Sequence, residues 1–309
     1  EDGRYAVLIA NVGLDRALLF RDLRTRPPSQ PLTAGDLAIR DAERALRRVS
    51  EQVSALKNDD RSESATAARA ELARCNEKRA AVLREYGEAS FGFVEAVAPT
   101  KAEFALVGNE GPSLILFTTL NAGKGRVIAM DTANPAPSNW REIVPEKTDS
   151  VLAAAVRVGD RILCNYRSGG CSRFALFGID GVAIKDVDLP GLGTAASLSG
   201  DMKSSAALYI FSSQTDPPSI FACNSETGQT RLLAQAKVDF EPADFETRQM
   251  FFKSKDGTRV PMFVSHKKGL KLDGSNPTLL FGYGGFGIGL TPTYNPLALQ
   301  WMEMGGLYA

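Results

Sequence analysis

Short apolar and β-branched runs, separated by turn residues, fill the chain between residues 104 and 233. The strands predicted in this stretch are Phe104–Val107, Leu114–Thr119, Val127–Met130, Val151–Val158, Arg161–Tyr166, Phe174–Phe177, Ala206–Phe211 and Ile220–Cys223. Strands at such close spacing, with no helical pattern between them, predict an all-β sandwich, barrel or propeller.

A weak internal repeat favours the propeller among these three folds. An apolar strand that runs into Asp or Asn and then a turn recurs at Asp131, Asp180 and Asn224, which are 49 and 44 residues apart. An earlier copy ends at Asp22, and its interval is about 52 residues once the helical segment described next is removed, close to the length of a four-stranded blade. A chance recurrence of common turn residues in another β fold is the alternative.

Residues 33–88 interrupt the β pattern with helical periodicity. Apolar residues recur every three or four positions along Ile39–Leu56 and again along Ala68–Val82, and the polar stretch Asn58–Ser62 separates the two runs. This spacing predicts an α-helical hairpin, which begins at Thr33. Acidic residues interleave with the arginines of the first helix, so we interpret its charges as a solvated face.

Composition and charge exclude several classes of function for this chain. The chain has 309 residues, with 36 basic and 36 acidic side chains, which argues against a nucleic-acid partner. Its apolar runs are too short to span a membrane. The first residues, Glu1–Tyr5, lack a starting Met, so we expect the sequence to be cut from a longer protein. The four cysteines lack the C-x-x-C spacing of metal sites, so we expect no metal, and we also expect no cofactor. Cysteines this sparse do not form a disulfide scaffold, so we expect a cytoplasmic location and two unrelated thiols at Cys164 and Cys171.

The pattern of apolar and turn residues changes again from residue 238 onward. Phe245–Ser254 and Arg259–Ser265 flank an Asp256-Gly257 pair, which predicts a hairpin with a two-residue turn. The apolar run Thr278–Phe281 then predicts a buried strand. A buried strand after a hairpin indicates the opening of a second domain with an α/β sheet.

The densest motif in the chain is the glycine-rich stretch Phe281–Gly287. Its glycines fit the G-x-G-x-x-G pattern, but the residues after it cannot open the helix that a dinucleotide site requires. In hydrolase sheets, the loop after the third strand often supplies half of the oxyanion hole, and Tyr283 would then be a hydrogen-bond donor. The alternative is a plain turn in which Tyr283 and Phe286 are core aromatics.

A hydrolytic triad cannot be assembled from these residues. His266 is the only histidine, it stands beside two lysines, and we expect an exposed residue at a strand end rather than a catalytic base. No G-x-S-x-G motif occurs in the chain.

The stretch Phe251–Gly269 closely resembles the entry to the catalytic domain of prolyl oligopeptidases, a family of serine peptidases. Leu272–Pro277 and Gly282–Phe286 continue the match, and weaker, collinear similarity extends upstream into the strand-rich stretch. The resemblance implies a seven-bladed propeller that caps an α/β-hydrolase domain and gates access to it. It also implies cleavage after proline in short peptides.

By this resemblance, Tyr283 would donate its hydroxyl to the oxyanion and Phe286 would line the substrate pocket. Gly287 stands where the family usually has Asn. The nucleophilic serine, the aspartate and the histidine of the family's triad are not matched in this chain, which we therefore expect to be inactive alone.

The resulting fold prediction is mainly β: a partial β-propeller of four-stranded blades with an inserted helical hairpin, followed by the first strands of an α/β-hydrolase domain. The predicted domains are residues 1–32 (part of a blade), 33–88 (the hairpin), 89–237 (blades) and 238–309 (the start of the catalytic domain). Short proline-containing peptides are the expected partners. The alternative function is a non-catalytic propeller whose hairpin, residues 33–88, binds a partner protein.

Overall fold

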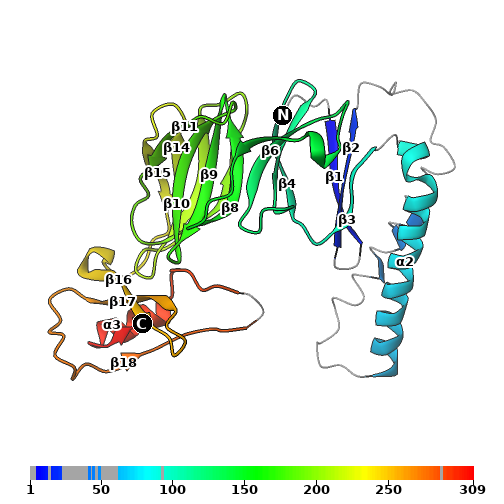
Figure 1. Ribbon diagram of the computed structural model, residues 1–309. Helices are drawn as coiled ribbons and strands as arrows, with labels where there is room; N and C mark the ends of the chain where they lie inside the picture. The colour runs from blue at the N-terminus through cyan, green and yellow to red at the C-terminus, as the bar shows by residue number, and fades with distance from the viewer. Residues whose placement is uncertain are drawn as a thin grey trace. The chain divides into compact units, whose positions relative to one another are not determined.

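The computed structural model describes residues 5–12, 15–22, 41–42, 44–45, 48–49, 62–91, 94–285 and 288–309 (Figure 1). The chain divides into two compact units, Glu1–Phe104 with Ala133–Asn139 and Ala105–Thr132 with Trp140–Ala309. No helix among the described residues is long and apolar enough to cross a membrane.

The first unit contains a three-stranded antiparallel sheet in the order β1-β2-β3. Its strands are β1 (Tyr5–Val12), β2 (Asp15–Asp22) and β3 (Val94–Thr100). Leu18 on the central strand is fully buried, and Arg16 forms an ion pair of 3.0 Å with Glu103.

A long helix, α2 (Glu63–Phe91), lies in the chain between the paired strands β2 and β3. Ser62 caps its beginning, because the Ser62 hydroxyl accepts a hydrogen bond of 3.2 Å from the backbone N–H of Ala65. Residues 41–42, 44–45 and 48–49 are also helical, while the rest of the first helix predicted within 33–88 lies outside the described residues.

The second unit contains three four-stranded sheets, each made of consecutive antiparallel strands. They are β4 (Phe104–Glu110), β5 (Ser113–Thr118), β6 (Arg126–Asp131) and β7 (Arg141–Val144); β8 (Val151–Val158), β9 (Arg161–Ser168), β10 (Cys171–Gly178) and β11 (Ala183–Val187); and β12 (Thr194–Ser199), β13 (Ala206–Ser212), β14 (Ser219–Asn224) and β15 (Thr230–Gln235). The described residues include two short 3₁₀ helices, η2 (Pro137–Asn139) in the first unit and η3 (Pro242–Asp244) in the second. The sheets begin at residues 104, 151 and 194, so the four-stranded repeat predicted from the sequence is confirmed.

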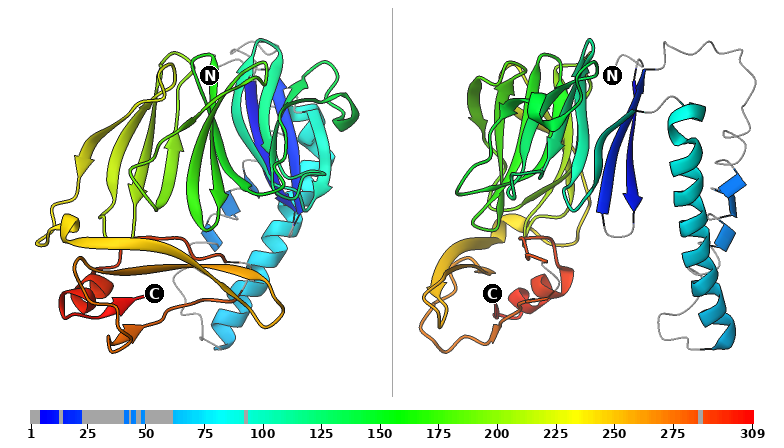
Figure 2. Two further views of the ribbon diagram at one scale, coloured as in Figure 1. Left: turned by 60° about the vertical axis from the view of Figure 1, so that its left-hand side comes forward. Right: turned by 45° about the vertical axis from the view of Figure 1, so that its right-hand side comes forward.

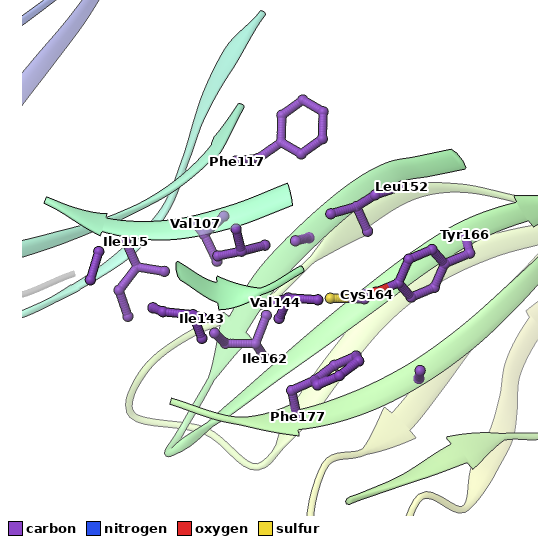
Figure 3. Packing of buried hydrophobic residues seen from close by; sticks show 14 residues of the cluster. Val107, Ile115, Phe117, Ile143, Val144, Leu152, Ile162, Cys164, Tyr166 and Phe177 are labelled. Carbon is purple, nitrogen blue, oxygen red and sulfur yellow. The ribbon is translucent and has the colours of Figure 1, made fainter. Parts of the chain in front are cut away.

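The strands β9 and β10 of the middle sheet are buried on both faces, because successive side chains point to opposite faces and a neighbouring sheet covers each face. From β9, Ile162, Cys164 and Tyr166 point into a cluster with residues of the β4–β7 sheet (Figure 3). Leu163, between them in sequence, packs instead with Tyr209 of the β12–β15 sheet. This two-sided packing, seen as neighbouring sheets in Figure 1, is the stacking expected of propeller blades.

A fifth sheet follows the three blades. It consists of β16 (Phe245–Lys253), β17 (Arg259–Lys267), β18 (Thr278–Leu279) and β19 (Leu307–Tyr308), in the order β16-β17-β19-β18. The predicted hairpin of β16 and β17 is confirmed, but its turn is longer than the two residues predicted. The N–H of Ser254 donates to the Thr258 carbonyl over 2.8 Å, so three residues form the loop, and Gly257 adopts a φ of 84°.

The pair β18 and β19 is parallel, and helix α3 (Pro296–Glu303) lies between the two strands in sequence. Ala298, Leu299 and Met302 of α3 pack with Phe245 and Tyr308 of the sheet, and Figure 2 shows α3 beside these strands. The Asn295 side chain caps α3 by accepting hydrogen bonds from the backbone N–H groups of Leu297 and Ala298.

The strand predicted over Thr278–Phe281 differs from the observed one in length and burial. Only Thr278–Leu279 is assigned as strand, and the side chains of Leu279, Leu280 and Phe281 are 48%, 72% and 57% exposed. The prediction of a buried strand was wrong because β18 occupies the edge of its sheet, where one side has no neighbouring strand among the described residues.

Candidate active site

The glycine-rich stretch begins at the carboxyl end of β18. The ladder between β18 and β19 runs through a hydrogen bond from Ala309 N–H to the Leu279 carbonyl (2.9 Å) and ends with one from Phe281 N–H to the Ala309 carbonyl (2.8 Å). Tyr283 follows two residues later. In open α/β sheets, ligands bind beyond the carboxyl ends of the parallel strands, and Tyr283 occupies such a position.

Tyr283 is 48% exposed, so the residue lies at the surface, where a ligand can reach it. Its oxygen would lie 3.5 Å from a Cβ added to Gly285, which means that the phenol lies over a residue without a side chain. A Cβ at Gly282 or Gly284 would meet nothing within 4 Å. Among the described glycines of this stretch, only Gly285 lies within contact distance of the phenol, and the backbone beside Tyr283 is otherwise open.

The other predicted binding residue cannot be placed. Phe286 and the neighbouring Gly287 lie outside the described residues. The structure therefore brings Tyr283 alone, among the predicted site residues, to the carboxyl edge of the β18–β19 pair.

His266 is buried, and its predicted exposure at a strand end was wrong. Its side chain is 2% exposed, its Nδ1 lies 3.0 Å from the Lys267 carbonyl, and its Nε2 lies 3.7 Å from Glu246 Oε1 on the paired strand β16. It is buried because β17 is flanked on both sides, by β16 and β19. This packing explains the histidine without any catalytic role.

The described part of the second unit contains cavities away from this loop. One, of about 720 Å³, lies at the ends of the β8–β11 strands and is lined by charged residues of both signs, including Lys147, Arg173 and Asp186. Lys147 places its ammonium 4.1 Å from the centre of the Tyr166 ring there. Another, of about 250 Å³, lies between the β12–β15 sheet and β16. Tyr283 lines neither of them.

A contact that the sequence did not indicate fixes the far end of the glycine-rich loop. The hydroxyl of Thr194, the first residue of β12, donates to the carbonyl of Pro292 over 2.7 Å. The partners are 98 residues apart, and neither belongs to a recognisable motif. No local signal in the sequence could have revealed this contact.

Comparison with known proteins places these features in a family. The family model described as "Prolyl oligopeptidase, N-terminal beta-propeller domain" matches residues 64–236, more than half of the chain. The chain belongs to the prolyl oligopeptidase family. Its stacked four-stranded sheets are the propeller part of that family, and the resemblance noted in the sequence is confirmed.

Several curated members of the prolyl oligopeptidase family are similar in sequence. A prolyl endopeptidase from Elizabethkingia miricola is 33% identical over 217 residues, which cover 70% of this chain and 30% of the relative. The dual function macrocyclase-peptidase POPB from Galerina marginata is 29% identical over 210 residues, covering 66% of this chain and 28% of the relative. The chain thus spans about 30% of the length of these relatives.

Solved structures agree with the sequence comparison. A structure from a study of two prolyl endopeptidases and their inter-domain dynamics has a TM-score of 0.63 and 34% identity, and the match covers 71% of this chain and 32% of that one. Prolyl oligopeptidase B from Galerina marginata, in its apo form, matches 100% of this chain and 36% of its own, with a TM-score of 0.70. At 21% identity, the second match supports the fold alone.

Proposed function

We propose that this chain is part of a serine oligopeptidase that cleaves short peptides after proline, and that Tyr283 donates a hydrogen bond to the oxyanion. The observation that carries the proposal is the position of Tyr283, an exposed residue just past the carboxyl end of a parallel strand pair. Family membership supplies the reaction class, since the similar curated proteins are named prolyl endopeptidases.

The proposed role follows from the chemistry of peptide hydrolysis. Attack of a serine hydroxyl on the peptide carbonyl gives a tetrahedral intermediate, in which the carbonyl oxygen carries a negative charge. A donor that is already oriented stabilises this charge more than it stabilises the neutral carbonyl, so it lowers the barrier. Tyr283 would supply this donor, while the serine, the base and its carboxylate would come from parts of the enzyme other than these 309 residues.

We also propose that sheet β16-β17-β19-β18 is the beginning of an α/β-hydrolase domain. The proposal is supported by the parallel pair β18 and β19, whose connection contains α3, because parallel strands need a crossover of this kind. It is further supported by the order of the elements: β18 is the third strand of its sheet along the chain, and in α/β-hydrolases the loop after the third strand contributes to the oxyanion hole.

In the proposed enzyme, the propeller restricts access of substrates to the active site, so that short proline-containing peptides are preferred. The proposed location is the cytoplasm, where thiols stay reduced, and this agrees with the free state of Cys75, Cys164, Cys171 and Cys223.

The test is the variant Tyr283→Phe in the full-length enzyme, assayed with a fluorogenic peptide that contains proline. Loss of one oxyanion donor is expected to lower kcat by about tenfold to a thousandfold, with a smaller change in KM. Tyr294→Phe is the matched control: its ring stacks on Phe240 at 6.0 Å and keeps this contact without the hydroxyl. A kcat for Tyr283→Phe equal to that of the control would remove Tyr283 from the proposed role.

A further inference from the structure

A side-chain hydroxyl of the propeller ties down the loop that carries Tyr283. This loop comprises residues 280–295, of which all but 286 and 287 are described, and joins β18 to α3. Within it, Pro292 is buried, although most of its described neighbours are exposed. The Pro292 carbonyl accepts the 2.7 Å hydrogen bond from the hydroxyl of Thr194 in the β12–β15 sheet.

Thr194 is itself held on both sides by the neighbouring blade. The backbone N–H of Ser172 donates to the Gly193 carbonyl (3.0 Å), and the Ser172 hydroxyl accepts from the Ala195 N–H (2.9 Å). The Asn165 side-chain amide donates to the Ala195 carbonyl (3.0 Å). Ser172 and Asn165 are each only 4% exposed. Because buried hydrogen bonds hold the backbone on both sides of Thr194, the position of Thr194 in the propeller is rigid.

The backbone before Thr194 also passes very close to the next strand. A Cβ added to Gly193 would lie 2.4 Å from the Phe211 ring and 2.4 Å from the Ser212 carbonyl oxygen of β13. This close approach is possible because residue 193 has no side chain. It holds the start of β12 in place independently of the hydrogen bonds to the adjacent blade.

The loop's other anchors lie at its two ends. At its beginning, the Phe281 N–H is bonded to the Ala309 carbonyl, and at its end, Tyr294 stacks on Phe240. Tyr283 lies between these ends, on exposed backbone beside glycines. Pro292 is therefore an attachment point that lies two residues nearer to Tyr283 along the chain than Tyr294 does.

We propose that Thr194 is a positioning residue: its hydroxyl, fixed by the propeller, holds the loop so that the Tyr283 hydroxyl stays in place for the oxyanion. This inference rests on the proposed function of Tyr283. The propeller would then contribute to catalysis by fixing the position of the loop that carries Tyr283. This effect would add to its proposed effect on substrate access. Small displacements of a donor are costly, because electrostatic stabilisation depends on its geometry.

The central experiment compares Thr194→Val, which keeps the shape of the side chain but loses the donor, with Thr194→Ser, which keeps the donor. In the full-length enzyme, Thr194→Val is expected to lower kcat by about threefold to tenfold, as for loss of one neutral hydrogen bond, with little change in KM. Thr194→Ser is expected to restore most of kcat. Thr230→Val is the control, because this threonine lies in the same sheet and its hydroxyl contacts the Asp188 carbonyl.

Two further measurements separate positioning from general damage to the fold. Hydrogen exchange of the loop amides should become faster in Thr194→Val and remain as in wild type in Thr230→Val. Thr194→Val should lower kcat less in a Tyr283→Phe background than in wild type, because a positioning residue acts through the group it positions.

The outcomes distinguish the two proposals. If Tyr283→Phe lowers kcat and Thr194→Val does not, or if Thr194→Ser is as slow as Thr194→Val, the positioning role is wrong and the oxyanion role stands. If Tyr283→Phe leaves kcat unchanged, the oxyanion role and the inference built on it are both wrong. Equal kcat losses from Thr194→Val in the two backgrounds would also overturn the inference.

Discussion

The hydroxyl of Ser265 on β17 donates a 2.5 Å hydrogen bond to Gln214 Oε1, in the connection between β13 and β14. Ser265 is fully buried, and the Thr247 hydroxyl lies 2.7 Å from its oxygen on the paired strand β16. This buried polar contact joins the last described blade to the sheet that carries the candidate site. Its partners are satisfied by one another, which is the condition for burying polar groups at low cost.

Replacing Ser265 by Ala should destabilise the protein by about 1–3 kcal/mol, because Gln214 Oε1 loses its donor in a buried site. The free energy of unfolding in urea measures this effect. Ser275→Ala is the matched control: its hydroxyl donates to Asp273 at an exposed position, and a change within about 0.5 kcal/mol is expected. The double variant Ser265→Ala with Gln214→Leu should recover part of the loss, and a further large loss would contradict this account.

A substitution at Gly193 tests how rigidly the start of β12 holds Thr194. Gly193→Ala should lower the free energy of unfolding by about 1–3 kcal/mol, because the new methyl group meets the Ser212 carbonyl oxygen, which is backbone and cannot rotate away. Gly191→Ala, two residues earlier, is the control, since a Cβ there meets nothing within 4 Å. Equal stabilities of the two variants, compared by thermal unfolding, would show that β12 shifts at little cost.

The sequence predicted most strands of the three blades, but it missed β12 and the fourth strand of each blade. The limits of β8 were predicted correctly, and β13 shows the expected alternation of buried and exposed residues. The fourth strand of each blade, β7, β11 or β15, was not among the predicted strands. Most residues of β11 and β15 are exposed, so these strands lack the apolar periodicity on which the prediction relied.

The candidate site was predictable only where its chemistry is local. Glycine spacing marked the loop of Tyr283 because the turn and its open surroundings depend on adjacent residues. Thr194 escaped notice because its role depends on a contact across 98 residues. His266 was misjudged since two neighbouring lysines suggested exposure, whereas the burial of a strand end depends on which strands flank it.

The cysteines offer a test of core packing through their reactivity. Burial raises the pKa of the Cys164 thiol from 9.0 to about 12 and that of the Cys223 thiol to about 11, and it also raises the pKa of Cys171. The thiolate is the reactive form, so at pH 8 burial keeps the Cys164 thiol almost entirely in its unreactive, protonated form. Cys75 on α2 is partly exposed.

We therefore expect a maleimide at pH 8 to modify Cys75 within minutes and the three buried thiols only after denaturation, as counted by mass spectrometry. Cys75→Ser is the control and should abolish the fast reaction. Because the folded state favours the protonated thiols, the stability they contribute is fully present below pH 9 and is lost as the pH rises towards 12. Labelling of Cys164 in the native protein as fast as that of Cys75 would show that the cluster around Ile162 and Tyr166 opens readily, contrary to the close packing of these sheets.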